Sequence, residues 1–139
     1  LDISLESQPF QAIKNWKPKN CITEKQYQNS LLLYLSTTSL ANSDIESEKP
    51  IGGNLRGTKG RADIVINNHI LIEMKRDSSA GAIQRAQGQI SSYSNIWRNR
   101  GPVVLLLCNH DFEHAKLAYT PTMIDLNKLE RPVLTIVAQ

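Results

Sequence analysis

Cysteine is scarce in this sequence, and long apolar runs are absent. The two cysteines, Cys21 and Cys108, lie far apart and neither belongs to a CxxC motif. This argues against a disulfide framework or a zinc ribbon and fits a reducing compartment, and we expect Cys108 to be a buried core thiol. The longest apolar runs, Leu31–Leu35 and Val103–Cys108, are far too short to cross a membrane, and we expect no signal peptide. We therefore expect a cytoplasmic protein that makes no membrane contact.

The length of the chain fits one folded domain. With 139 residues it can bury a single core, and it contains no internal repeat or low-complexity tract. Because the chain opens with Leu-Asp-Ile and not with Met, we expect a domain excised from a longer protein. We expect residues 1–20 to form a leading arm that docks through Phe10, Ile13 and Trp16, and residues 21–139 to form the core. The formal net charge of +3 suits a polyanionic partner and is too small to carry more weight.

Apolar periodicity predicts one helix in the first half of the chain. It begins after Thr23, whose hydroxyl suits an N-cap, and runs to about Leu40. Its apolar side chains are Tyr27, Leu31, Leu32 and Leu35. The next stretch, Asn42–Lys49, is polar and acidic and closes at Pro50. The glycine-rich, basic stretch Ile51–Gly60 predicts a flexible loop.

The second half of the chain has a clearer pattern. The β-branched segments Ala62–Ile66 and Ile70–Met74 predict a hairpin around Asn67-Asn68-His69. Ser78 and Ser79 are candidate caps of a helix over Ala80–Arg98. Its apolar stripe consists of Ala82, Ala86, Ile90, Tyr93 and Trp97.

The remaining elements follow Gly101-Pro102, which ends that helix. The continuous apolar run Val103–Cys108 predicts a strand buried on both faces. We expect a short helix near Phe112–Ala118 and a last strand over Val133–Val137. The order predicts an α/β fold in which helices flank a central mixed β-sheet.

A charged pair lies within an otherwise apolar strand. In Ile70–Lys75 the carboxylate of Glu73 and the ammonium of Lys75 are two residues apart, so both leave the same face. Burying either charge without a partner costs roughly several kcal/mol. Such a pattern therefore usually indicates a structural or functional role for the charged residues. Asp63 has a similar setting on the preceding strand. Two carboxylates and one lysine therefore converge at one end of the hairpin.

Metal-assisted phosphodiester hydrolysis uses this set of side chains. Carboxylate oxygens hold Mg²⁺ and leave positions open for water and phosphate. The metal polarises the phosphoryl oxygen and lowers the pKa of its bound water, and a lysine can stabilise the charge that develops. The set therefore predicts a Mg²⁺-dependent nuclease, with Mn²⁺ as a substitute cofactor.

These residues resemble the core of the PD-(D/E)XK nuclease superfamily. The matching segments are Gly60–Ile66, which contains Asp63, and Leu71–Lys75, which contains Glu73-Met74-Lys75. On the following helix, Gln89-Ile90-Ser91-Ser92-Tyr93 is similar to the QxxxY element of the RecB-type branch. The resemblance covers roughly residues 24–108. Ala62 stands where the family pattern has proline, and RecB-type members often lack that proline.

The resemblance implies a restriction-endonuclease-like core in α-β-β-β-α-β order and a role for each matching residue. Asp63 and Glu73 would bind the metal, with the carbonyl of Met74 as a third ligand. Lys75 would be the catalytic lysine. Further implied catalytic residues are Gln89 and Tyr93, which would line the site, and Glu24 would be an auxiliary metal carboxylate.

Charge clusters around the same site. We expect nucleic acid, with DNA favoured over RNA, to contact five basic residues: Arg56, Lys59, Arg61, Arg76 and Arg85. His69 falls in the predicted hairpin turn, and His110 and His114 have no evident third ligand, so we expect surface roles for the three histidines. The predicted activity is endonucleolytic.

Three alternatives remain open at this point. Lys75 and one carboxylate could form a buried ion pair with no further role. The domain could be a catalytically silent nucleic-acid-binding module on the same fold. It could also be a toxin or effector nuclease that acts on tRNA or DNA and is held in check by an inhibitor or immunity protein.

Hairpin register decides whether the carboxylates can meet. A two-residue turn at Asn67-Asn68 would place Asp63 and Glu73 on opposite faces, whereas a three-residue loop that includes His69 would pair them. Such loops usually need a left-handed residue, and Asn is the best residue for it after glycine. We predict an odd-length loop, or an even one corrected by a β-bulge.

Overall fold

The computed structural model describes residues 8–19, 21–38, 40–55, 58–76, 79–97, 101–108 and 134–138. It contains three helices and five strands within these ranges. They are α1 (Gln8–Asn15), α2 (Glu24–Leu35), β1 (Ile45–Leu55), β2 (Thr58–Ile66), β3 (Ile70–Lys75), α3 (Ala80–Trp97), β4 (Val103–Cys108) and β5 (Leu134–Ala138).

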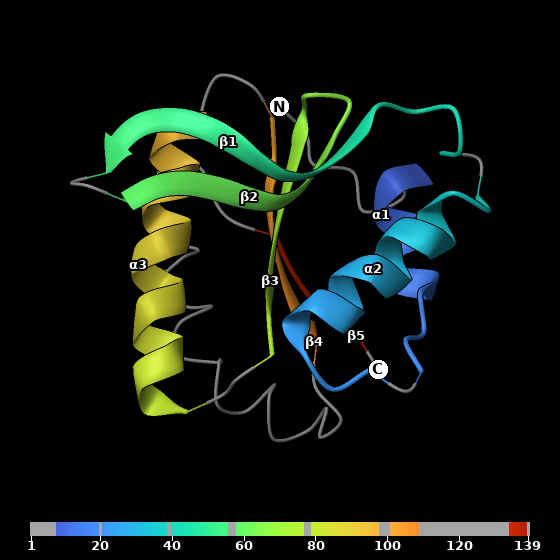
Figure 1. Cartoon of the computed structure of the whole chain (residues 1–139), viewed down its shortest axis with the longest axis horizontal. Helices are drawn as coiled ribbons and strands as arrows, with labels where there is room; N and C mark the ends of the chain where they lie inside the picture. Colours follow the sequence, from blue (N-terminus) through green and yellow to red (C-terminus); the bar gives the residue numbers. More distant parts are fainter. Residues whose placement is uncertain are drawn as a thin grey trace.

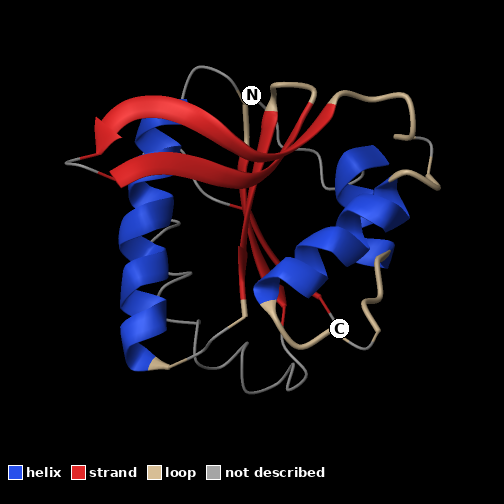
Figure 2. Ribbon diagram, in the orientation of Figure 1, coloured by secondary structure: helices blue, strands red, loops and turns tan. Residues whose placement is uncertain are grey.

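One mixed sheet forms the centre of the molecule, in the order β1-β2-β3-β4-β5. The pairs β1–β2 and β2–β3 are antiparallel, and β3–β4 and β4–β5 are parallel. Helices α1 and α2 cover one face and α3 covers the other, while the long β1–β2 hairpin curves away from β3 across one end of α3 (Figures 1 and 2). The predicted mixed α/β architecture is therefore confirmed.

Each face of the sheet has its own core. On β3, Ile72 and Met74 belong to the cluster under α1 and α2, whereas Leu71 belongs to the cluster under α3. This is the period-two alternation of a strand that is covered on both sides. Ile13 and Trp16, two of the expected docking points, are buried in the first cluster, and the Phe10 side chain lies outside the described part of the chain.

Helix α2 begins as predicted and ends earlier. Thr23 is its N-cap in a capping box with Gln26. The prediction that it continues to about Leu40 is wrong, because it ends at Leu35. The hydroxyls of Thr37 and Thr38 donate to the carbonyls three residues earlier, at 2.7 and 2.8 Å, so they compete with helical hydrogen bonding at that end.

The stretch Ile51–Gly60 is not the flexible loop that its composition predicted. Ile51–Leu55 is the second half of β1, and Thr58–Gly60 opens β2. The strand β1 is the outermost strand of the described sheet, and an edge strand tolerates proline and glycine because half of its backbone groups need no ladder partner. The pairing is irregular between Pro50 and Asn54, where glycines lie.

The hairpin turn has the odd length that we predicted. Ile66 pairs with Ile70, so Asn67, Asn68 and His69 form a three-residue loop. Asn67 and Asn68 have φ values of 54° and 52°, in the left-handed region that asparagine tolerates. The His69 amide donates to the Ile66 carbonyl at 3.0 Å and closes the turn. The register therefore runs toward Asp63 and Glu73 as the nuclease prediction required.

The turn is fixed against the connection that follows α3. Trp97 Nε1 donates to the His69 carbonyl at 2.8 Å, and the Leu71 amide donates to the Pro102 carbonyl at 3.1 Å. A Cβ on Gly101 would overlap with the backbone of His69, so a glycine is needed at this close approach.

The second half of the chain agrees with the prediction where it is described. Helix α3 begins after Ser79, whose Oγ accepts from the Ala82 amide at 3.3 Å, and its five stripe residues are all buried. Every residue of β4 is buried, Cys108 included, and both cysteines are free thiols. Ser78, Arg98, His110, His114 and Phe112–Ala118 lie outside the described residues. None of the described helices is long and apolar enough to cross a membrane.

Candidate active site

Asp63 lies where the ladder between β2 and β3 stops. The last regular pair before it is Ile64 with Ile72. Beyond that pair, the Met74 amide donates to Oδ2 of Asp63 at 2.7 Å, and the Asp63 carbonyl accepts from Gln28 Nε2 at 3.1 Å. Side chains thus replace the backbone partners that a continuous ladder would supply.

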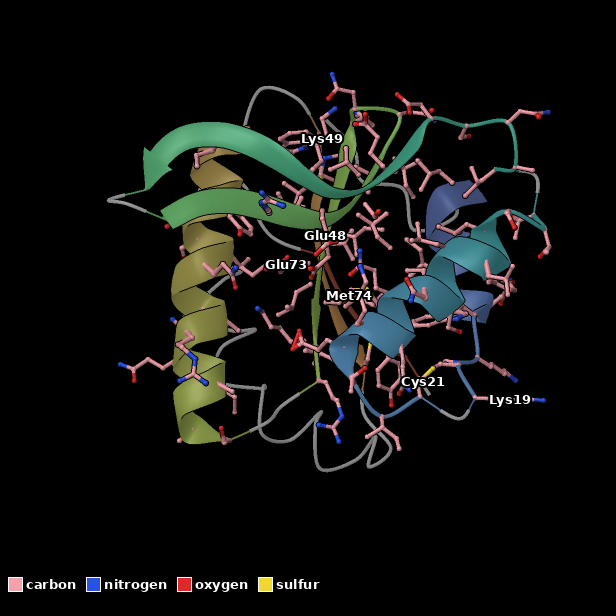
Figure 3. All side chains as sticks on the ribbon, viewed as in Figure 1. Lys19, Cys21, Glu48, Lys49, Glu73 and Met74 are labelled. Carbon is pink, nitrogen blue, oxygen red and sulfur yellow. The ribbon has the colours of Figure 1, made fainter. Side chains whose placement is uncertain are left out.

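The neighbouring strand bends at the same place. Glu48 lies between residues of β1 that pair with Ile64 and Ala62, so it is opposite Asp63. Its φ is 50°, which is unusual for a residue other than glycine. Figure 3 labels Glu48, Glu73 and Met74 around the point where the β1–β2 hairpin turns away from β3. The bend separates β2 from β3 and leaves the carboxylate of Asp63 between them.

Glu73 and Lys75 leave the same face of β3, as period two predicted. Lys75 Nζ lies 3.5 Å from Oε2 of Glu73. The Glu73 side chain is 2% exposed and that of Lys75 is 20% exposed. The second carboxylate oxygen of Glu73, Oε1, is buried and has no hydrogen-bond partner. In the ionised form of Glu73, no group of the described residues donates a hydrogen bond to Oε1.

The surroundings of Glu73 favour its protonated form. Burial is the main cause, and the charge of Asp63 and a hydrogen bond with Asp63 act in the same direction. The Lys75 ammonium acts in the opposite direction and does not outweigh them. Together they raise the pKa of Glu73 to about 9. A positive charge additional to Lys75 would be needed to ionise this carboxylate at neutral pH.

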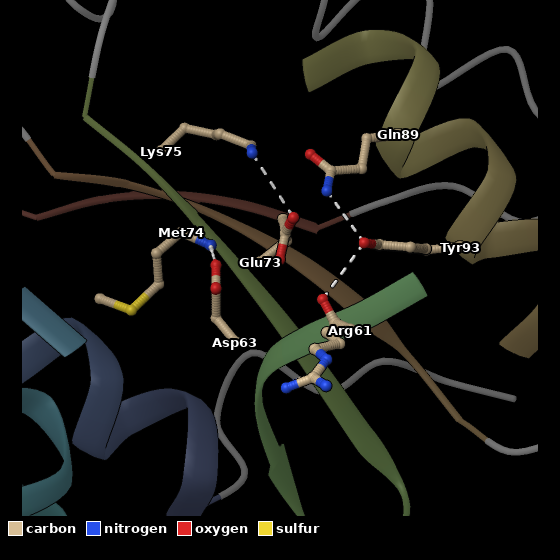
Figure 4. A network of polar contacts seen from close by, with 7 residues as sticks. All are labelled: Arg61, Asp63, Glu73, Met74, Lys75, Gln89 and Tyr93. Carbon is tan, nitrogen blue, oxygen red and sulfur yellow. Dashed lines mark hydrogen bonds and ion pairs between the residues drawn. The ribbon is translucent and has the colours of Figure 1, made fainter. Parts of the chain in front are cut away.

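Gln89 and Tyr93 meet the site from α3. Gln89 Nε2 donates to the Tyr93 hydroxyl at 2.9 Å, and that hydroxyl donates to the Arg61 carbonyl at 3.2 Å (Figure 4). Burial and then the Glu73 carboxylate raise the pKa of Tyr93. The structure therefore brings Gln89 and Tyr93 to the same site as Glu73. The hydroxyl proton of Tyr93 is directed to the backbone of β2.

Glu24 is the most exposed of the three expected acids. It is exposed in the first turn of α2. Burial raises the pKa of the Cys108 thiol, and the Glu24 and Asp63 carboxylates raise it further, so both act on the same thiol. Within the described residues, no group of three or more His, Cys, Asp and Glu side chains is arranged to hold a metal ion. Glu24 does not complete such a group with Asp63 and Glu73.

The donors that are present still suit a hard divalent cation. Mg²⁺ is commonly held by one or two carboxylates and completes its shell with water and phosphate. Asp63 and Glu73 supply two carboxylates, and the unpartnered Oε1 of Glu73 is a free donor atom. Since N–H and C=O of one strand residue leave the same edge, the Met74 carbonyl is directed toward Asp63 as its amide is.

The expected basic contacts are placed unevenly. Arg61 and Arg85 are exposed, on β2 and α3, and Arg76 is half-buried just after β3. Arg56 and the side chain of Lys59 lie outside the described part of the chain. His69 is exposed in the turn, as expected for a surface role.

Gln28 is a residue of the site that was not predicted from the sequence. This side chain from α2 is 5% exposed and donates to the backbone of Asp63. A signal was present in the sequence, because Gln28 follows Tyr27 and lies one helical turn before Leu32, on the apolar side of the helix. A polar residue in such a stripe needs a hydrogen-bond partner.

Comparison with known proteins adds no assignment. No protein-family profile, curated protein or solved structure matches this chain.

Proposed function

We propose that this chain is a metal-dependent nuclease domain with a restriction-endonuclease-like core. It hydrolyses phosphodiester bonds of nucleic acid, with DNA preferred over RNA and with endonucleolytic cleavage. The observation that carries the proposal is the meeting of Asp63, buried Glu73 and Lys75 at the break between β2 and β3. The fold order, three strands between two helices and then a parallel strand, agrees with such a core.

A plain ion pair is a poorer explanation of this arrangement. An ion pair whose only role was to neutralise Glu73 would be expected to offset most of the cost of burying its carboxylate. Here Oε1 of Glu73 has no hydrogen-bond partner, and the pKa of the side chain is raised to about 9 despite Lys75. Ionising Glu73 in this setting is unfavourable, and a buried carboxyl with a strongly raised pKa is a candidate functional group.

Each residue has a definite task in the proposed reaction. Asp63 and Glu73, with the carbonyl of Met74, would hold Mg²⁺ or Mn²⁺, which supplies activation of a water molecule and charge stabilisation at the phosphate. The Lys75 side chain is 20% exposed, so its ammonium can contact a bound phosphate in addition to its contact with Glu73. Arg61 and Arg85 are exposed cations that can contact the nucleic-acid backbone.

The test is a digest of plasmid DNA, single-stranded DNA and total RNA with Mg²⁺, with Mn²⁺ and with a chelator. We expect cleavage that needs metal and that falls at least about 100-fold in Asp63→Asn and Glu73→Gln. Glu46→Gln is the matched control, because this carboxylate on β1 pairs with Lys49 outside the site. Near-wild-type cleavage by Glu73→Gln would remove the assignment.

The same substrates, in the digest and in a binding assay, separate the alternative functions. Binding of these substrates without cleavage under any metal condition would indicate a silent binding module. Cleavage confined to tRNA would favour a toxin or effector domain, and an inhibitor protein would then be the partner to seek.

A further inference from the structure

Two polar side chains are buried among the described residues, Gln28 and Glu73. The proposed function uses Glu73 and gives Gln28 no task. A buried amide is costly unless it is hydrogen-bonded, and Gln28 Nε2 makes its bond to the carbonyl of Asp63 at 3.1 Å. Both buried polar side chains therefore converge on Asp63, from two different elements.

The Asp63 carbonyl has no partner in the regular pairing of the sheet. The β1–β2 register pairs Ile64 with Ser47 and Ala62 with Lys49, and Asp63 between them has no register partner on β1. Its carboxylate is already fixed by the Met74 amide at 2.7 Å. Gln28 fixes the backbone of the same residue from α2. One residue thus has its main chain and its side chain held by separate donors.

Contacts from both faces of the sheet hold β2 at the bend. From α2, Lys25 pairs with Glu48 on β1 at 3.0 Å, one helical turn before Gln28. From α3, the Tyr93 hydroxyl donates to the Arg61 carbonyl at 3.2 Å. The bonds of Gln28 and Tyr93 fall two residues apart on β2, so side-chain donors from α2 and α3 contact the strand at and next to Asp63.

We propose that Gln28 is a positioning residue, which holds Asp63 where its carboxylate meets Glu73 and the Met74 amide. It contacts no substrate or reacting atom, and it acts through the backbone of Asp63. Its importance for metal binding and cleavage rests on the proposed nuclease function. Its effect on the geometry of Asp63 does not, and the two can be measured separately.

The geometric test is hydrogen exchange of single amides by NMR in Gln28→Met, which keeps the unbranched shape and removes the donor. The reporter is the Met74 amide, which is bonded to the Asp63 carboxylate. The reference is the Leu71 amide on the same strand, which is bonded to Pro102. We expect exchange at Met74 to accelerate about tenfold, with Leu71 changed less than about twofold.

Two further variants make the result specific. Gln28→Asn keeps the amide but is shorter by one methylene, so its amide is withdrawn from the Asp63 carbonyl. This variant replaces Gln28→Met in the exchange experiment if the Met variant does not fold. Ser30→Ala removes a different side-chain bond of α2, from Trp16 Nε1 at 3.2 Å, and should leave both amides as in wild type. Equal acceleration at Met74 and Leu71, or none at either, would overturn the positioning role.

The functional test uses the same variants. We expect Gln28→Met to cleave about tenfold more slowly at low Mg²⁺ and to need about tenfold more Mg²⁺ for half-maximal rate, with Ser30→Ala unchanged. A Met variant with wild-type metal dependence would contradict the inference even if the enzyme is active. If wild type cleaves no nucleic acid, the proposed function fails, and the Met74 amide still decides the role of Gln28.

Discussion

The ammonium of Lys75 lies 3.5 Å from Glu73, yet the carboxylate keeps a pKa of about 9. Burial and the charge of Asp63 outweigh the attraction of the lysine. Without a further cation, Glu73 therefore holds its proton at neutral pH. The proposed metal binding would therefore be coupled to pH and to stability at this one side chain.

Stability should fall as pH rises because of Glu73. Its folded-state pKa, about 9, exceeds the ordinary value of 4.5, so the folded state keeps a proton that the unfolded chain has lost between these limits. The contribution to stability is complete below pH 4.5 and is lost as pH rises through 9. The slope is at most about 1.4 kcal/mol per pH unit. Urea unfolding at pH values within this window should show the decline in wild type and a flatter profile in Glu73→Gln. Parallel profiles would contradict the prediction.

Metal binding should release a proton and tighten with pH. A carboxylate must be ionised to bind Mg²⁺, and the Glu73 side chain is protonated at neutral pH. We expect the Mg²⁺-induced rise in Tm to grow between neutral pH and pH 9, and calorimetry to record close to one proton released per ion at neutral pH. Glu73→Gln should lose both effects. A rise in Tm that persists in this variant would show that the ion binds elsewhere.

Lys75→Met should separate catalysis from metal binding. The ammonium is near the carboxylates and is not a ligand, so the variant should keep the Mg²⁺-induced rise in Tm and lose cleavage by at least about 100-fold. Lys14→Met on α1 is the control, because that lysine is exposed and on another element. Equal cleavage in the two variants would exclude a catalytic role for Lys75.

Two glycines should respond in opposite ways to alanine. At Gly101 a Cβ would overlap with the backbone of His69, so Gly101→Ala should destabilise the fold by about 1–3 kcal/mol. At Gly88, on the exposed side of α3, nothing lies within 4 Å of a Cβ, and Gly88→Ala should stabilise by roughly 0.5–1 kcal/mol. Chemical denaturation of both variants is the measurement. A stabilised Gly101→Ala would mean that the turn is not held as described.

The elements with strong apolar patterns were predictable from the sequence. Helix α3 and strand β4 bury the residues that their patterns selected, and the turn at Asn67-Asn68 has the length that the spacing of Asp63 and Glu73 demanded. These features are local, because each depends on residues close together in the chain.

The features that escaped prediction depend on distant partners. The second half of β1 is rich in glycine and follows Pro50, and it is a strand because β2 pairs with it. Gln28 acquires its role from Asp63, which lies 35 residues later. Beyond the end of α2 at Leu35, the hydroxyls and amides of Thr37 and Thr38 bond the carbonyls three residues earlier. Propensity alone does not contain such information.

Whether the hairpin turn has an odd or an even number of residues determines which side chains of β3 lie at the candidate site. With three residues in the turn, Glu73 and Lys75 share the face that α3 covers. Insertion or loss of one residue would exchange the two faces of β3, so that Met74 would enter the polar side and Glu73 the apolar core. A change of two residues would preserve the faces. Natural variation in this turn should therefore come in pairs of residues, or in single residues that a β-bulge offsets, and the contacts of Trp97 and Gly101 with His69 restrict it further.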